Sequence, residues 1–147
     1  MDGETSEIQA SLANCGLEHQ VAIASMLVAA AIRDGEFAHG EEDKILQLLG
    51  EAFQLQLEDA RNRLDAAVTR IIKTTSLSVL LGDLRYHLSL TQKQEALLML
   101  LKVIAADGRQ TAEEIDLISQ ASENLKLSRE ATHEVFNRYF AEHQAQA

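Results

Sequence analysis

The sequence predicts an all-α bundle of about seven helices that contains an internal helix–loop–helix duplication. Three observations predict this fold: the chain has no proline and only seven glycines, it is rich in residues that favour helix, and one segment recurs. A β-rich fold needs many turn, β-branched and aromatic residues. We expect a single domain over residues 1–147, with its core at about 17–140, because 147 residues suit one hydrophobic core.

The hydrophobic pattern predicts the first half of the bundle. A short leading helix is expected over 6–14, followed by a buried helix over 17–33. Residues 21–32 of that helix are apolar apart from Ser25, and this 12-residue stretch is too short to cross a bilayer. We expect the Asp34-Gly35 pair to end the buried helix, with Gly35 in the left-handed conformation that often follows a helix. Two amphipathic helices are then expected: 40–53 and 57–74.

Capping residues predict where the later helices begin. Ser76 is expected to cap a helix that reaches about Leu88. In a capping box, a Ser or Thr and a Glu or Gln three residues later bond each other's backbone N–H groups. Two such boxes open the next two helices: Thr91-x-x-Gln94 and Thr111-x-x-Glu114. Ser128 is expected to cap the last helix, which buries four residues: Val135, Phe136, Tyr139 and Phe140.

Two segments align without a gap when Met26 is placed on Met99. Eight of the 22 positions from 26 to 47 are then identical to those from 99 to 120. The identical pairs are Met26 and Met99, Leu27 and Leu100, Asp34 and Asp107, Gly35 and Gly108, Glu41 and Glu114, Asp43 and Asp116, Ile45 and Ile118, and Gln47 and Gln120. Because polar residues recur at the same spacing, the pattern indicates a duplication.

The repeated acidic residues are the candidate metal ligands. Asp34 and Asp107 each follow a buried helix, where the helix dipole disfavours a carboxylate by about 0.3–1 kcal/mol. Glu41 and Glu114 stand seven residues later. Four carboxylates suit a divalent cation, Ca²⁺ or Mg²⁺ before Mn²⁺ or Zn²⁺. Neither loop has the spacing of an EF-hand, so the site requires that the two loops meet in space.

A structural interpretation of the same acids stays open. Asp-Gly is a common end of a helix, and capping with Thr111 explains Glu114. It explains Glu41 less well, because Ala38 stands where Thr111 does. The alternative function is a protein-interaction module without a metal, which would capture a partner helix in an apolar groove. A hydrolase using the paired acids would need a cleft around them.

Composition limits the partners and the chemistry. A net charge of −10 disfavours binding to nucleic acid and to anionic lipid. The single cysteine, Cys15, allows no intramolecular disulfide, and the acidic start is not a secretory signal, so we expect a cytoplasmic protein. The sequence has no Gly-rich phosphate loop and no histidine pair at metal-ligand spacing. We therefore expect no enzyme and no organic cofactor, an unknown protein partner, and a monomer or weak homodimer.

Two short stretches of the repeat form a recognisable pattern. The first is Ala29-Ala-Ala-Ile-Arg-Asp-Gly-Glu36 with Glu41, and the second is Ile104-Ala-Ala-Asp-Gly108 with Glu113-Glu114 and Ile118. Together they resemble the tellurite-resistance TerB-like family. The resemblance covers about Leu17 to Phe140. It implies an all-α bundle of about seven helices with a duplication, a role in stress response, and a metal-binding cluster of Asp34, Glu41, Asp107 and Glu114. Arg109 departs from the pattern, since an acid such as Glu36 often follows Asp-Gly in the family.

Overall fold

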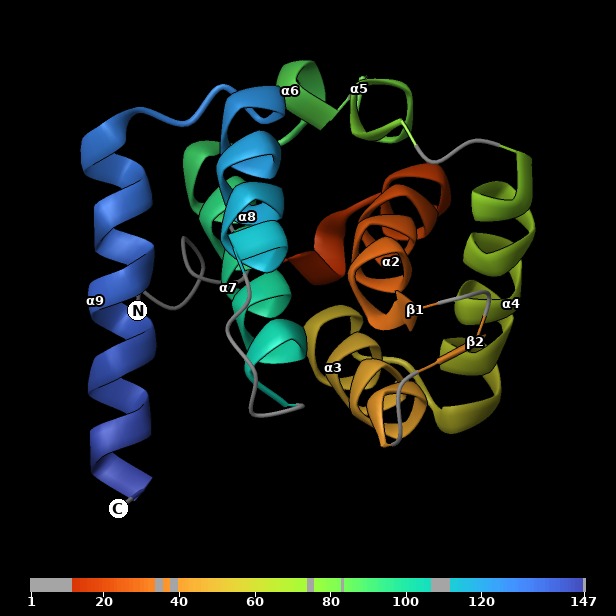
Figure 1. The fold of residues 1–147 in the computed structure, drawn as a ribbon. Helices are drawn as coiled ribbons and strands as arrows, with labels where there is room; N and C mark the ends of the chain where they lie inside the picture. The colour runs from red at the N-terminus through yellow and green to blue at the C-terminus, as the bar shows by residue number, and fades with distance from the viewer. Residues whose placement is uncertain are drawn as a thin grey trace, which may run out of the picture.

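The structure is a computed structural model that describes residues 12–33, 36–37, 40–73, 76–82, 84–106 and 112–146. Six long helices dominate the described residues (Figure 1): α2 (Leu17–Ala31), α3 (Glu41–Phe53), α4 (Leu57–Lys73), α7 (Leu90–Ala106), α8 (Ala112–Asn124) and α9 (Arg129–Gln146). The shorter elements are η1 (Leu12–Asn14), β1 (Ile32–Arg33), β2 (Glu36–Phe37), α5 (Leu77–Leu80) and α6 (Leu84–His87). The predicted all-α bundle is confirmed. None of the described helices is long and apolar enough to cross a membrane.

Helices α2 and α7 form the centre of the molecule and pack against each other. Helix α2 also packs against α3, α4, α5 and α8, and α7 against α3, α8 and α9. Figure 1 shows α4 and α9 at opposite sides of this centre. Because α2 is apolar nearly all round, it is buried on most faces. The fully buried side chains of the two central helices include Ile23, Met26, Leu27, Leu97 and Leu100.

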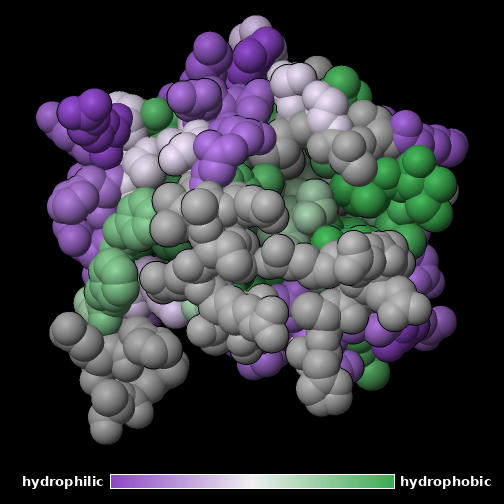
Figure 2. Space-filling view, viewed as in Figure 1, coloured by the Kyte–Doolittle hydropathy of each residue, from purple (hydrophilic) through white to green (hydrophobic). Residues whose placement is uncertain are grey.

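The surface is mixed in polarity. In the view of Figure 1, hydrophilic residues cover the upper left and hydrophobic residues gather at the right, where α4 lies (Figure 2). Two large apolar side chains of α4 are exposed: Leu57 at 68% and Ile72 at 80%. Leu57 is therefore outside the buried stripe of its helix, which comprises Ala60, Leu64, Ala67 and Ile71.

The duplication extends to three helices in each copy, which is longer than the predicted helix–loop–helix unit. Helices α2 and α7 begin at Leu17 and Leu90, which are equivalent positions in the alignment of Met26 with Met99. Helices α4 and α9 begin at Leu57 and Arg129, and here the offset between the copies is shorter by a single position. We call residues 17–73 the first repeat and residues 90–146 the second repeat.

The two repeats also end their second helices in the same way. The backbone N–H of Leu55 donates to the Gly50 carbonyl at 3.0 Å, and that of Leu127 donates to the Ser122 carbonyl at 3.0 Å. The residue before each leucine has a positive φ: 54° at Gln54 and 60° at Lys126. This is the Schellman arrangement, in which an apolar residue follows the left-handed one. Leu55 and Leu127 both pack against the core.

The first buried helix ends at Ala31, two residues before its predicted end. Ile32 has an extended backbone (φ −81°, ψ 126°) and pairs with Phe37, while Arg33 pairs with Glu36. A β-branched residue favours this extended conformation. The Asp34-Gly35 pair, and therefore the predicted conformation of Gly35, lies outside the described residues.

The predicted single helix over 76–88 is wrong, because the structure has two four-residue helices there, α5 and α6. Gly82 lies between them, and glycine is a poor helix former. A Cβ at Gly82 would approach the Ser78 carbonyl oxygen to 3.0 Å, which explains why the chain needs glycine in this position. The break lets three leucines face the core: Leu80, Leu81 and Leu84.

Hydrogen bonds show which residue caps each of two helices whose starts were predicted, α7 and α9. The capping box of α7 is Ser89-x-x-Gln92, not the predicted Thr91-x-x-Gln94: the Gln92 N–H donates to Ser89 Oγ at 3.1 Å, and the Ser89 N–H donates to Gln92 Oε1 at 2.9 Å. The cap of α9 is confirmed, since the Ala131 N–H donates to Ser128 Oγ at 3.0 Å. The predicted box at Thr111 lies outside the described residues.

The prediction that four residues of the last helix are buried is correct only in part. Val135 is buried, and Phe136 and Tyr139 pack against the core. Phe140 is 55% exposed, so its predicted burial is wrong.

Candidate functional site

The four predicted ligands differ in what the structure describes of them. Glu41 is the first residue of α3, and its side chain is 2% exposed. Glu114 lies in the first turn of α8, but its side chain is not described. Asp34 and Asp107 lie outside the described residues, between β1 and β2 and directly after α7. The structure therefore does not test whether the four acids meet.

Glu41 is positioned by the turn that starts α3. Gly40 directly before it has a φ of 82°, a left-handed conformation that glycine adopts without steric strain. The N-terminal end of a helix favours a carboxylate. Burial opposes this, because a charged group out of water is costly unless it is paired or bound to a cation. The position and the burial of Glu41 suit a structural carboxylate at a helix start as well as a cation ligand.

The neighbouring acids of α3 have different surroundings. Glu42 forms an ion pair with Arg61 of α4 at 3.3 Å, and both side chains are close to half exposed. Asp43 is exposed. Of the three acids in this turn, only Glu41 is buried.

A metal centre is not complete within the described part of the chain. There, no three His, Cys, Asp or Glu side chains gather where they could hold a metal ion together. This finding does not cover the predicted cluster, because Glu41 is the single member of that cluster whose side chain is described.

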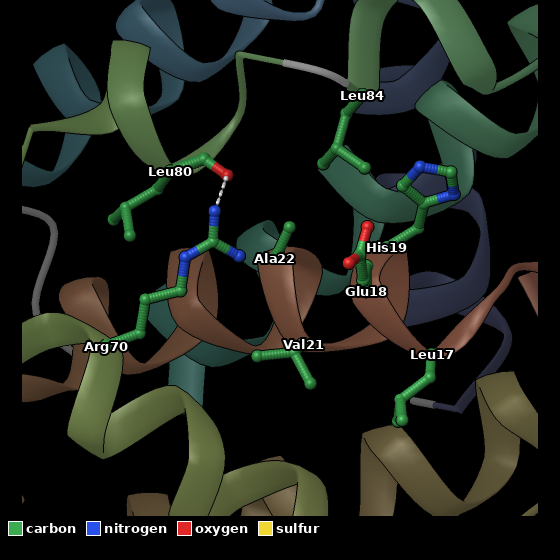
Figure 3. A pocket seen from close by; sticks show the side chains of 8 residues that line it. All are labelled: Leu17, Glu18, His19, Val21, Ala22, Arg70, Leu80 and Leu84. Atoms are coloured by element: carbon green, nitrogen blue, oxygen red, sulfur yellow. Dashed lines mark hydrogen bonds between the residues drawn. The ribbon is translucent and has the colours of Figure 1, made fainter.

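A cavity lies between α2, α4 and the α5–α6 segment, with a volume of about 450 Å³ (Figure 3). Arg70 extends into it and donates from Nη2 to the Leu80 carbonyl oxygen at 3.4 Å. Glu18 and His19 of α2 supply the other polar groups, and the remaining lining is aliphatic. None of its described lining residues is a Ser, Thr or Cys nucleophile, and Glu41 does not line it. The cavity therefore gives no support to a hydrolase that uses the repeated acids.

Sequence reasoning missed the contacts at the start of α2. His19 stacks on His87 of α6, with ring centroids 5.0 Å apart and an interplanar angle of 24°. Gln20 accepts a hydrogen bond from Arg63 Nε at 2.9 Å and donates to the Cys15 carbonyl at 3.1 Å. His87 and Arg63 are distant in sequence from the start of α2 and share no local motif with it, so only the tertiary fold reveals these two contacts.

The cysteine beside these residues is chemically quiet. Cys15 is half-buried between η1 and α2, and this burial raises the pKa of its thiol from 9.0 to about 11. Desolvation disfavours the thiolate, which is the nucleophilic form. Cys15 is therefore a packing residue and not a nucleophile at neutral pH.

Comparison with known proteins identifies one family. The family model described as "Tellurite resistance protein TerB" matches residues 20–137, which covers α3, α4, α7 and α8, most of α2 and the first half of α9. No curated protein and no solved structure matches the chain.

Proposed function

Since this chain belongs to the tellurite resistance TerB family, we propose that it is a non-enzymatic cytoplasmic module that binds a divalent cation. The proposed ligands are Asp34, Glu41, Asp107 and Glu114, two from each repeat. Its proposed setting is a stress response of the tellurite-resistance type. Carboxylate ligands favour Ca²⁺ or Mg²⁺ over Mn²⁺ and Zn²⁺.

The observation that carries the proposal is the burial of Glu41. Glu41 is 2% exposed as a whole residue and its Oε2 atom is buried, whereas the side chain of the adjacent Glu42 is 46% exposed. Carboxylate oxygens are the ligands that Ca²⁺ and Mg²⁺ take, and the repeat matches Glu41 with Glu114. The packing of α2 on α7 and of α3 on α7 supports a site shared by the repeats, because each proposed ligand lies near an end of one of these helices or of α8.

The test is thermal unfolding after chelation, with Ca²⁺, Mg²⁺, Mn²⁺ or Zn²⁺ added back. A cation at about 100 times its dissociation constant stabilises the fold by about 2.7 kcal/mol. We expect a rise of several degrees in the midpoint with Ca²⁺ or Mg²⁺, and its loss in Glu41→Gln, Asp34→Asn and Asp107→Asn.

Glu42→Gln is the matched control, because it removes the same charge from the neighbouring residue, whose side chain is close to half exposed. It should keep the response to the cation. If no cation raises the midpoint, or if Glu42→Gln abolishes the rise as fully as Glu41→Gln, the proposed site is wrong. The acids are then structural, which leaves the interaction module as the function.

A further inference from the structure

A second cavity lies between α3 and α4, in the first repeat, with a volume of about 390 Å³. We call it the α3–α4 groove. Its apolar lining comes from Leu46, Gly50, Leu55, Leu57 and Ala60, and Gln47 and the acids Asp43 and Glu51 also line it. Leu57 is 68% exposed, although its apolar neighbours in the groove are largely covered. An exposed leucine beside a hollow is a typical contact point for a partner's apolar side chain.

The second repeat provides an internal comparison for this surface. Three apolar residues of the groove have polar counterparts at the equivalent positions: Leu46 corresponds to Ser119, Leu57 to Arg129 and Ala60 to Thr132. Thr132 is also hydrogen-bonded to the Ser122 side chain. Leu46 and Ala60 are buried in the core of the first repeat, whereas Leu57 is exposed, so Leu57 is the position where packing does not require an apolar residue and where the second repeat has an arginine.

The charges of the groove indicate what kind of partner it fits. Its described lining includes two acids and no basic residue. Asp43 and Glu51 are eight residues apart on α3, which is about 12 Å along a helix. Lysines or arginines two turns apart on a helix laid along α3 would match this spacing. A second copy of this chain fits poorly, because its net charge is −10.

We infer that the α3–α4 groove binds a short basic amphipathic helix of a partner protein, with an apolar side chain of that helix against Leu57 and Leu46 and its basic residues near Asp43 and Glu51. Glu41, the proposed cation ligand whose side chain is described, does not line the groove. Binding should therefore persist in the presence of a chelator, and the failure of either proposal leaves the other intact.

The test uses the full chain and a labelled helix-forming peptide of alanine, leucine and lysine. The leucines lie on one face and the lysines are two turns apart. Affinity is measured by fluorescence anisotropy in chelator, for this peptide and for the same peptide with glutamate in place of lysine. Leu57→Arg, which copies Arg129 of the second repeat, should weaken binding about tenfold or more. Because Leu57 is largely exposed, this variant should keep the wild-type unfolding midpoint.

Ile72→Arg is the matched control, since it makes the same change at an exposed apolar position of the same helix. It should change the affinity less than about twofold. The double variant Asp43→Asn with Glu51→Gln should weaken binding and reduce its dependence on salt. The inference is overturned if Leu57→Arg and Ile72→Arg act equally, if the glutamate peptide binds as well, or if sedimentation shows that Leu57 mediates self-association.

Discussion

The outer helices of the two repeats are attached to the centre in different ways. In the first repeat, α4 buries Ala60, Leu64, Ala67 and Ile71 against α2, and α3 packs beside it. In the second repeat, the buried residues among the described side chains of α9 are Ala131 and Val135. Over the described residues, α8 and α9 make little contact. The same three-helix topology therefore has an apolar interface in one copy and a smaller one in the other.

Polar contacts supply much of the attachment of α9. Gln94 of α7 donates from Nε2 to the Ala131 carbonyl at 3.0 Å and to Glu134 Oε2 at 2.9 Å. Arg138 forms an ion pair with Glu95, and a further pair joins two partly exposed side chains, Lys102 and Glu142, at 3.4 Å. Exposed ion pairs each contribute about 0–1 kcal/mol, whereas a buried leucine contributes about 1.5–3 kcal/mol. We therefore expect α9 to open at a lower free energy than α4.

The largest expected effect is the loss of a buried side chain from α4. Leu64→Ala removes a side chain that is 1% exposed, so the transfer free energy is lost and a cavity remains. We expect it to lower the free energy of unfolding by about 2–5 kcal/mol, measured by urea denaturation. Val135→Ala, at the 2% exposed position of α9, should cost about 1–2 kcal/mol, because fewer methyl groups are lost. Equal costs would break the contrast between the two outer helices.

The residue two positions before each central helix allows a chemical comparison of the two repeats. Cys15 corresponds to Leu88 of the second repeat, which is buried at 7% exposed. Since burial raises the pKa of the Cys15 thiol to about 11, the thiolate is scarce at pH 8. We expect alkylation by iodoacetamide to be slow at pH 8 and to rise about tenfold per pH unit until the pH approaches 11. A rate that levels off near pH 9 would show that Cys15 does not occupy the buried position of its counterpart.

Much of this fold could be predicted from the sequence, because long periodic helices carry their own signal. The observed α3 and α4 agree with the predicted helices to within a residue or so, and the alignment of Met26 with Met99 identifies the duplication. The prediction stopped at helix–loop–helix because the offset between the copies becomes shorter by a single position by the end of α3 and α8. The third helices also share few residue types, as Leu57 and Arg129 illustrate.

The errors arise where several local choices were equally plausible. Ser89 and Thr91 are both good caps, and each has a glutamine three residues later, so only the observed hydrogen bonds decide between them. Less of the candidate site than of the fold could be predicted from the sequence. The repeated spacing singles out Glu41. Its burial depends on how α3 packs on the central helices, which is a tertiary property.

Removing the cap of α7 should have an intermediate effect. Ser89→Ala loses the hydroxyl that accepts from the Gln92 N–H, and we expect a cost of about 1 kcal/mol in the free energy of unfolding. Thr91→Ala is the control, because Thr91 is exposed and lies inside the helix; it should change stability by less than about 0.5 kcal/mol. If Thr91→Ala is the more damaging of the two, the capping box lies where the sequence placed it and the central helices of the two repeats do not start at equivalent positions.

The smallest effect tests whether the first repeat can accept the cap that the second repeat uses. Gly16 stands where Ser89 does, its backbone is extended (φ −68°, ψ 164°), and no side-chain cap bonds the start of α2. A Cβ at this position would meet nothing within 4 Å. Gly16→Ser should therefore raise the free energy of unfolding by about 0.3–1 kcal/mol, through a new cap and a less flexible unfolded chain. Gly16→Ala separates these causes in thermal unfolding, since it restricts the unfolded chain without supplying an acceptor. A gain with serine alone would show that the two repeats can start their central helices with the same cap. A loss with serine would show that the first repeat, which has His19 in place of Gln92, cannot use the serine cap of the second repeat.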